Sequence, residues 1–208
     1  IQVRYRWFGP DYVSLANSTL RQDLKGFNVS DRFQLFDNSF YVTLGYENLQ
    51  NNVLDTKDAT THTKTYRTNL SWYPVKSTLP RISVNARLRD RGNGVGRINP
   101  FVPGTQKMAA VRNVRSDSTV TPNPVESFTT QLSGSITQQF ELGSVINDAT
   151  LNVSYLRTTD EVFEYGGTKS LSYSLNVQNR FGGLPLDTQF GVNVNQTESA
   201  GGLSSLDI

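Results

Sequence analysis

Five arginines are the residues of this chain whose type and spacing favour a chemical role. In segments where polar and apolar residues alternate, these arginines all occupy polar positions: Arg67, Arg81, Arg87, Arg89 and Arg180. Residues two apart in a β-strand point to the same side of a sheet. The guanidinium groups are therefore expected to line one face. If that face surrounds an aqueous channel, a lining of cations favours the passage of anions.

A second interpretation of the same arginines is that each one pairs with a carboxylate inside a packed structure. Glu47 and Asp187 lie in other alternating segments and are the expected partners. Paired charges cost less to bury than isolated ones. Both interpretations stay open at the level of the sequence.

Residue types that catalyse reactions or bind metals are scarce. His62 is the only histidine, and the chain has no cysteine, whereas metal sites and catalytic triads combine several such side chains. The glycine-rich segment Gly92–Gly96 lacks the lysine and the spacing of a phosphate-binding loop. We therefore predict no catalytic, metal or cofactor site, and we expect that the protein is not an enzyme.

The composition favours a single all-β domain over residues 1–208. Hydrophobic residues make up 36% of the chain and charged residues 18%. Uncharged Ser, Thr, Asn and Gln, which suit a hydrated face, supply much of the remainder. A net charge of +2 is too small to argue for nucleic acid as a partner.

The arginines require strands to position them. Ile82, Val84, Ala86 and Leu88 alternate with polar residues, which is the period of a strand with one apolar and one polar face. Similar alternation recurs along the chain and predicts an antiparallel meander of about nine strands. They are expected near residues 1–8, 26–36, 40–52, 63–73, 81–91, 126–142, 149–160, 169–181 and 186–197.

The links between these segments alternate in length. The short links are 37–39, 74–80, 143–148 and 182–185, and the long links are 9–25, 53–62, 92–125 and 161–168. Short turns at one end and long loops at the other are typical of a transmembrane β-barrel. The strand lengths suit the roughly 9–11 residues that a tilted membrane strand needs.

Aromatic residues on the apolar positions support a barrel, because many lie near strand ends, where aromatic girdles meet the membrane interface. They are Tyr5, Trp7, Phe40, Tyr46, Tyr66, Trp72, Phe128, Phe140, Tyr173 and Phe181. Asp31 breaks the pattern, since it shares a register with Phe27 and Val29. A bulge would move it to the polar face; without one, a carboxylate faces lipid.

The strand count leads us to expect part of a larger barrel. Bacterial single-chain barrels have an even number of strands, and this chain ends at Ile208, not at an aromatic residue. The link 92–125 exceeds the roughly 12–15 residues usual for structureless links, so we expect a constriction, a lid or a partner-binding loop. Short helices are expected near Leu20 to Leu24 and near Met108 to Val114.

Two stretches of the first 75 or so residues resemble outer-membrane β-barrel proteins of Bacteroidota-type bacteria. Arg6–Leu15 joins an aromatic-rich strand to a loop of the form P-x-Y-x-S-L, and Leu35–Phe40 follows with an asparagine before a strand. Tyr46–Lys57 is similar to a link found in the same proteins. The resemblance implies a barrel in the outer membrane and assigns no catalytic residue.

We therefore expect a barrel segment in a bacterial outer membrane, with the lipid bilayer and other outer-membrane or surface subunits as its partners. The first hypothesis is a porin-like or transport-associated barrel that passes small polar or anionic solutes. The second is a scaffold barrel of a larger surface or secretion assembly, with a filled lumen. The third is a soluble secreted β-sandwich or adhesin.

Overall fold

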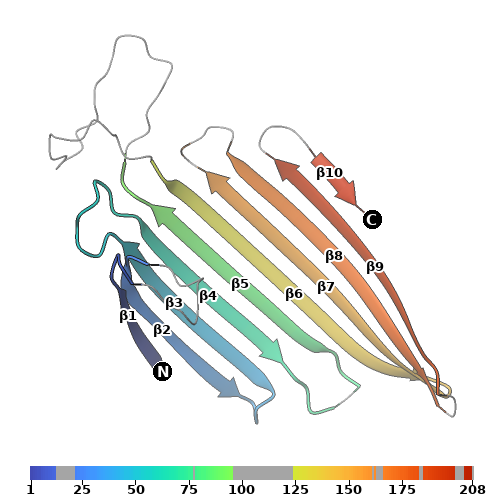
Figure 1. Cartoon of the computed structure of the whole chain (residues 1–208). Helices are drawn as coiled ribbons and strands as arrows, with labels where there is room; N and C mark the ends of the chain where they lie inside the picture. Colours follow the sequence, from blue (N-terminus) through green and yellow to red (C-terminus); the bar gives the residue numbers. More distant parts are fainter. Residues whose placement is uncertain are drawn as a thin grey trace.

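One antiparallel sheet contains all the strands of the described part of the chain. The computed structural model describes residues 1–12, 22–76, 78–95, 124–160, 162, 166–182, 185–199 and 204–207. Each strand pairs with the next one along the chain (Figure 1). The strands are β1 (Gln2–Phe8), β2 (Leu24–Leu35), β3 (Phe40–Asn51), β4 (His62–Trp72), β5 (Arg81–Gly92), β6 (Glu126–Leu142), β7 (Val145–Asp160), β8 (Gly167–Phe181), β9 (Asp187–Ser199) and β10 (Ser204–Asp207).

The predicted all-β antiparallel meander is confirmed, with one boundary corrected. β7 begins at Val145, so the expected link 143–148 shrinks to Gly143 and Ser144. Gly143 has a φ of 63°, as the first central residue of a two-residue hairpin turn often does. The polar Asn147 interrupts the alternation, but its side-chain amide donates to the carbonyl of Phe140 at 3.3 Å and the strand continues. The short β10 had not been predicted.

The register places the alternating residues on two separate faces. In an antiparallel pair, residues directly opposite each other lie on the same face. Tyr46 faces Tyr66, and Tyr66 faces Leu88 on the next strand. Leu132 likewise faces Tyr155 across β6 and β7. We call the face that carries these residues the apolar face, and the opposite one the polar face.

The links fall into two classes by end of the sheet. The links β2–β3, β4–β5, β6–β7 and β8–β9 lie at one end, which we call the turn end, and the links between the other pairs lie at the loop end (Figure 1). In the β2–β3 turn, Phe36, Asp37 and Asn38 all have positive φ. The predicted alternation of short turns with longer links holds only in part, because the turn-end link 73–80 is longer than the loop-end link 161–166.

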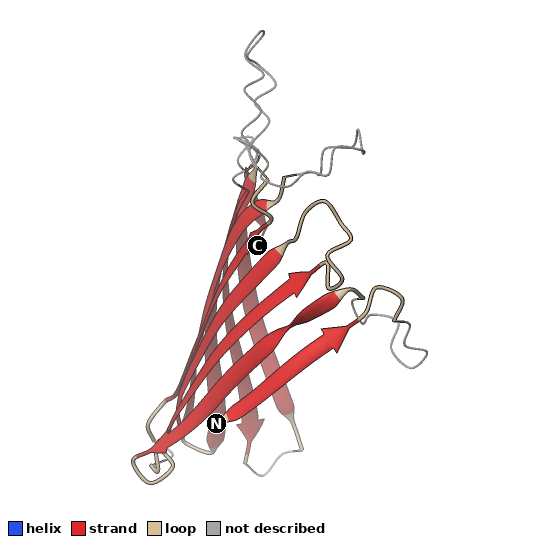
Figure 2. Cartoon of the chain, turned by 90° about the vertical axis from the view of Figure 1, so that its left-hand side faces the viewer, coloured by secondary structure: helices blue, strands red, loops and turns tan. Residues whose placement is uncertain are grey.

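The sheet is a single curved layer with no conventional core. Figure 2 shows it as an open trough. Within the described residues, Val53 is the only buried hydrophobic residue, and β1 and β10 do not pair with each other. Large apolar side chains such as Tyr66, Leu132 and Phe190 stay between 44% and 60% exposed. No helix in the described part of the chain is long and apolar enough to cross a membrane.

Asp31 remains on the apolar face. β2 and β3 pair without interruption from Leu24 opposite Asn51 to Leu35 opposite Phe40, so the bulge that could have moved Asp31 is absent. Its carboxylate lies 3.2 Å from the amino group of Ile1. The exception foreseen for this position is therefore real, and a carboxylate lies on the apolar face.

Two loop expectations are only partly covered by the structure. The helix expected near Leu20 to Leu24 is not formed in its described portion, because Leu24 begins β2. The helix expected near Met108 to Val114 lies outside the described residues, as does most of the long link 92–125.

Gly26 provides a test of the β2–β3 pairing. A Cβ atom added there would lie 2.0 Å from the carbonyl oxygen of Asn48, at a φ of 154°. We expect Gly26→Ala to lower the free energy of unfolding by about 1–3 kcal/mol, as overpacking does. Gly45→Ala, also on the polar face, is the control, because its Cβ would meet nothing closer than 3.6 Å. Urea unfolding measures both, and equal losses would contradict the close approach of these strands.

Candidate functional site

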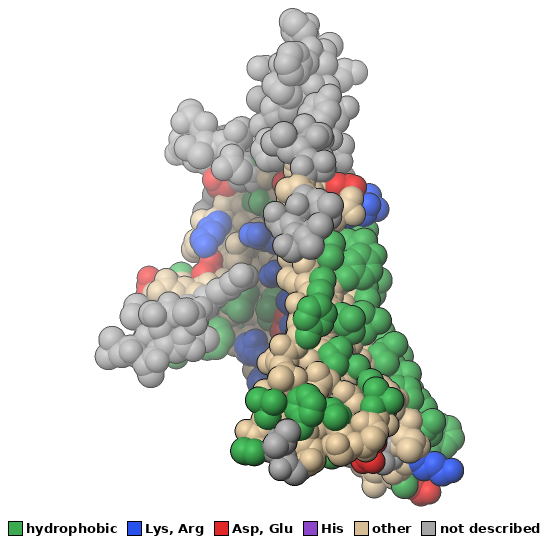
Figure 3. Space-filling view, turned by 90° about the vertical axis from the view of Figure 1, so that its right-hand side faces the viewer, with side chains coloured by type: hydrophobic (Ala, Val, Ile, Leu, Met, Phe, Trp, Pro, Cys, Tyr) green, Lys and Arg blue, Asp and Glu red, His purple; other side chains and the backbone are tan. Residues whose placement is uncertain are grey.

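The five arginines predicted to share one face do so. Arg67 lies directly opposite Arg87, and Arg81 and Arg89 lie opposite Thr137 and Thr129 of β6. Arg180 is on the same face of β8. In Figure 3, hydrophobic side chains cover one long flank of the sheet, whereas Lys and Arg side chains gather in the hollow beside it.

Glu47 is the carboxylate at the centre of this cationic face. One of its oxygens lies 3.2 Å from Arg67, and the other lies 3.9 Å from Arg6. The Glu47 side chain is only 12% exposed. The expected pairing of Glu47 with an arginine of the polar face is therefore confirmed. Thr65, which lies between Glu47 and Arg89 in the register, is 1% exposed because longer side chains surround it.

Arg180 does not pair with the expected carboxylate. It lies directly opposite Asp187, yet its guanidinium group is 3.3 Å from Asp148 on the other neighbouring strand. Asp148 stands diagonal to Arg180, since Arg180 is opposite Ile146. Long side chains reach diagonal neighbours as well as direct ones, so alternation alone could not select between the two aspartates.

Four further arginines belong to the same face and were not singled out from the sequence, among them Arg32 of β2, which lies opposite Thr43. Arg91 follows Arg87 and Arg89 on β5, and Arg4 and Arg6 lie on β1. The alternation in β1 could have identified the last two, because Tyr5 and Trp7 take the apolar positions on either side of Arg6. The cationic part of the wall is therefore larger than the predicted set.

The polar face changes character between β5 and β6. From β6 to β9 its middle portion consists of uncharged residues that bond one another across the strands. Ser83 contacts Ser135 at 2.8 Å, Thr137 contacts Thr150 at 3.2 Å, and Asn152 donates to Ser174 at 3.1 Å. The middle portion of this half of the wall is therefore polar and uncharged, and the side chains named here have hydrogen-bond partners within the sheet.

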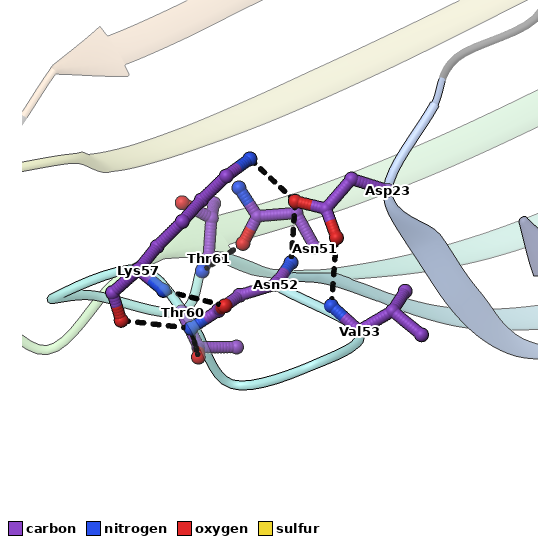
Figure 4. Close-up of polar contacts among 7 residues, drawn as sticks. All are labelled: Asp23, Asn51, Asn52, Val53, Lys57, Thr60 and Thr61. Carbon is purple, nitrogen blue, oxygen red and sulfur yellow. Dashed lines mark hydrogen bonds and ion pairs between the residues drawn. The ribbon is translucent and has the colours of Figure 1, made fainter. Parts of the chain in front are cut away.

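A compact polar cluster closes the loop end of the same face (Figure 4). Asp23, just before β2, accepts hydrogen bonds from the backbone N–H groups of Asn52 and Val53 at 3.1 and 2.8 Å. It also pairs with the ammonium group of Lys57. The Asn52 side chain in turn donates to the Lys57 carbonyl and accepts from the Lys57 N–H. We call these four residues the Asp23 clasp.

The clasp fixes two links that are distant in sequence. Asp23 is 7% exposed and Asn52 is 3% exposed, and both have positive φ. The hydrogen bond from Lys57, aided by the two backbone N–H groups, holds the pKa of Asp23 below its ordinary value of 3.8, although burial acts in the opposite direction. Beside the clasp lies a hollow of about 370 Å³ that Arg91, Thr63 and Lys57 help to line.

In the part of the chain that the structure describes, residues suited to catalysis are not brought together. His62 is exposed at the first position of β4. Gly92 ends β5, and Gly96 lies outside the described residues. Over the ranges that the structure describes, no group of three His, Cys, Asp or Glu side chains could hold a metal ion. The polar face therefore presents guanidinium groups on its N-terminal strands and mainly uncharged polar groups on the middle of β6 to β9.

Comparisons of the chain with protein families, with curated proteins and with solved structures give no match.

The Asp23 clasp predicts a charge-dependent contribution to stability. Asp23→Asn should lower the free energy of unfolding by about 1–3 kcal/mol at neutral pH, because a buried charged acceptor is lost. Since the folded pKa lies below 3.8, the contribution is present above that pH and is lost as the pH falls through the folded value. The difference from the unmodified protein should therefore shrink in acid.

Asp55→Asn is the matched control, because Asp55 is exposed in the β3–β4 link to which Asp23 is bound. Urea unfolding at pH 7 and at pH 3 measures both variants. A loss at Asp55 equal to that at Asp23, or an Asp23 effect that does not change in acid, would contradict this account of the clasp.

Proposed function

We propose that this chain forms part of the wall of a transmembrane β-barrel in a bacterial outer membrane, and that the barrel is porin-like and passes small polar or anionic solutes. The observation that carries the proposal is the two-faced single sheet. One face is apolar and uncovered by protein, and the other is polar and rich in arginine.

The uncovered apolar face argues for lipid as its solvent. Burying a large apolar side chain stabilises the folded state by about 1.5–3 kcal/mol. A side chain that stays half-exposed to water therefore forgoes on the order of 1 kcal/mol of that stabilisation. Summed over the many exposed residues of this face, the loss exceeds the net stability of about 5–15 kcal/mol typical of a domain. Contact with lipid removes the loss without a second protein layer.

A soluble β-sandwich is less well supported. A sandwich buries its apolar residues between two packed sheets. The described strands form one sheet, ordered from β1 to β10. The strands also run to between 11 and 17 residues from β2 to β9, longer than the roughly 5–6 residues most common in globular proteins.

The edges of the apolar face resemble the two interfaces of a bilayer. Toward the turn end, Phe40 lies directly opposite Trp72. Toward the loop end, the Tyr46 ring lies 5.1 Å from Tyr66 and 5.7 Å from Phe27. Aromatic residues favour the interfacial level of membranes. The two groups support a membrane position for the residues between them.

Charged residues mark the loop-end limit of the apolar face. Lys64 lies opposite Asp90, at the next position of the same face toward the loop end from Tyr66 and Leu88. Lys169 lies opposite Glu198 and forms an ion pair with it at 3.2 Å. Charges beyond an aromatic row are expected where the strands leave the hydrocarbon layer.

A scaffold barrel with a filled lumen is the second candidate. The ion pairs Arg67–Glu47 and Arg180–Asp148 favour it, because a packed lumen requires its charges to be paired. It shares the membrane position with the first candidate and differs in whether water fills the lumen.

Adjacent residues of β5 test the membrane position. Val84→Arg should cost about 2–4 kcal/mol if Val84 faces lipid near the midplane. Ser83→Arg, one position away on the polar face, should cost little. Urea-dependent folding into lipid vesicles measures the free energy for both. Comparable losses at the two positions would exclude a membrane-spanning sheet.

Conductance separates the two candidate functions. We expect the full-length protein, reconstituted in planar bilayers, to pass ions with a preference for anions, because a few lining cations set the field of a narrow pore. The reversal potential under a salt gradient measures the preference. Membrane insertion without any conductance would remove the porin-like function and favour the scaffold.

A further inference from the structure

Positive charge is concentrated on one half of the polar face. Among the described strands β1 to β5, Glu47 is the one carboxylate on this face, as the register shows. The arginines that share the face with it are Arg4, Arg6, Arg32, Arg67, Arg81, Arg87, Arg89 and Arg91. On β6 to β9 the charged residues of this face include Asp148, Asp187 and Arg180.

The greatest density lies across β4 and β5. Arg67 and Arg87 are directly opposite each other, and Arg89 and Arg91 continue along β5 at every second residue. We call these four residues the arginine strip. At about 3.3 Å per residue, the strip extends roughly 13 Å along β5, from the Arg67–Arg87 pair to the hollow beside the Asp23 clasp.

The Arg67–Arg87 pair carries more positive charge than its neighbours offset. Like charges placed directly opposite each other destabilise a sheet. Glu47 contacts Arg67 but is shared with Arg6. Among the described residues, Arg87 has no carboxylate within ion-pair distance, and its partner on β6 is the neutral Gln131. An anion bound at Arg67 and Arg87 would relieve this repulsion.

The surroundings leave room for such an anion. Gly45 is the neighbour of Arg67 on β3, and it has no side chain to cover the wall. At the other end of the strip, Arg91 and Lys57 line the hollow of about 370 Å³. Guanidinium groups donate parallel hydrogen bonds that match the oxygens of phosphate and carboxylate.

We propose that the arginine strip is a binding site for a multivalent oxyanion, specifically a solute that carries a phosphate group. The proposal rests on the proposed function, since solutes reach the strip from the lumen. It goes further in assigning a discrete site on β4 and β5, in place of a lumen that is uniformly favourable to anions. The neutral wall of β6 to β9 takes no part in binding the charge.

The experiment adds inorganic phosphate to the full-length protein reconstituted in planar bilayers and measures the chloride current. Phosphate should reduce the chloride current in a saturable way at constant ionic strength. The double variant Arg67→Gln, Arg87→Gln should raise the half-saturating phosphate concentration at least about tenfold, the effect of removing charge-assisted hydrogen bonds. Arg87→Lys should keep the preference for anions but weaken phosphate binding, because lysine lacks the forked donor geometry.

Arg180→Gln is the matched control, since it removes one arginine of the same face that is already paired with Asp148. Its half-saturating concentration should stay near that of the unmodified protein. An equal weakening in this control would show that phosphate responds to overall charge, and it would overturn the site. Circular dichroism confirms that each variant is folded.

Calorimetric titration of phosphate into the detergent-solubilised protein separates the two proposals. Binding that depends on Arg67 and Arg87, without any conductance, would keep the site and remove the pore. Conductance with no saturable phosphate effect and no heat of binding would overturn the site and leave the pore.

Discussion

The two-residue period of the strands, held in register across the whole sheet, is the constraint on which the rest of this structure depends. Because side chains alternate between faces, a shift of one residue in any strand would move its apolar set to the polar face. The uninterrupted pairing from β2 to β9 prevents such a shift. The separation of an apolar face from an arginine-rich face is thus a property of the entire sheet.

Glycine and the Asp23 clasp help to hold this register on the N-terminal side. Gly26 allows β2 to approach Asn48 more closely than any side chain would permit. The clasp then ties the start of β2 to the β3–β4 link through Asp23 and Lys57. Arg91 lies beside the clasp, so the same contacts that close the loop end also position one end of the arginine strip.

The sequence was sufficient for the strands because their signals are local. Alternation located nine strands and the correct face for Arg67, Arg81, Arg87, Arg89 and Arg180. It could not choose Asp148 over Asp187 as the partner of Arg180, since both satisfy the alternation and only the side-chain geometry separates them.

The Asp23 clasp was missed for a different reason. Asp23 binds backbone groups about thirty residues away, and its partners in the β3–β4 link have no periodic pattern. The start of β7 was missed because Asn147 breaks the alternation, while its hydrogen bond to Phe140 keeps it in the sheet. The two-residue period identifies strands that pair regularly. It does not reveal positions where one polar side chain departs from the alternation and is held by its own hydrogen bonds.

The two halves of the polar face bear differently on whether water fills the space in front of them. On β6 to β9, Thr150 and Asn152 form hydrogen bonds with side chains of neighbouring strands. Because these polar groups already have partners, that wall can face either water or packed protein. On β4 and β5, Arg67 and Arg87 face each other with Glu47 beside only one of them. Enclosing that pair without water or an added anion would leave charge uncompensated, at a cost of several kcal/mol. In the barrel that we propose, the arginine strip therefore favours a hydrated lumen over a packed one.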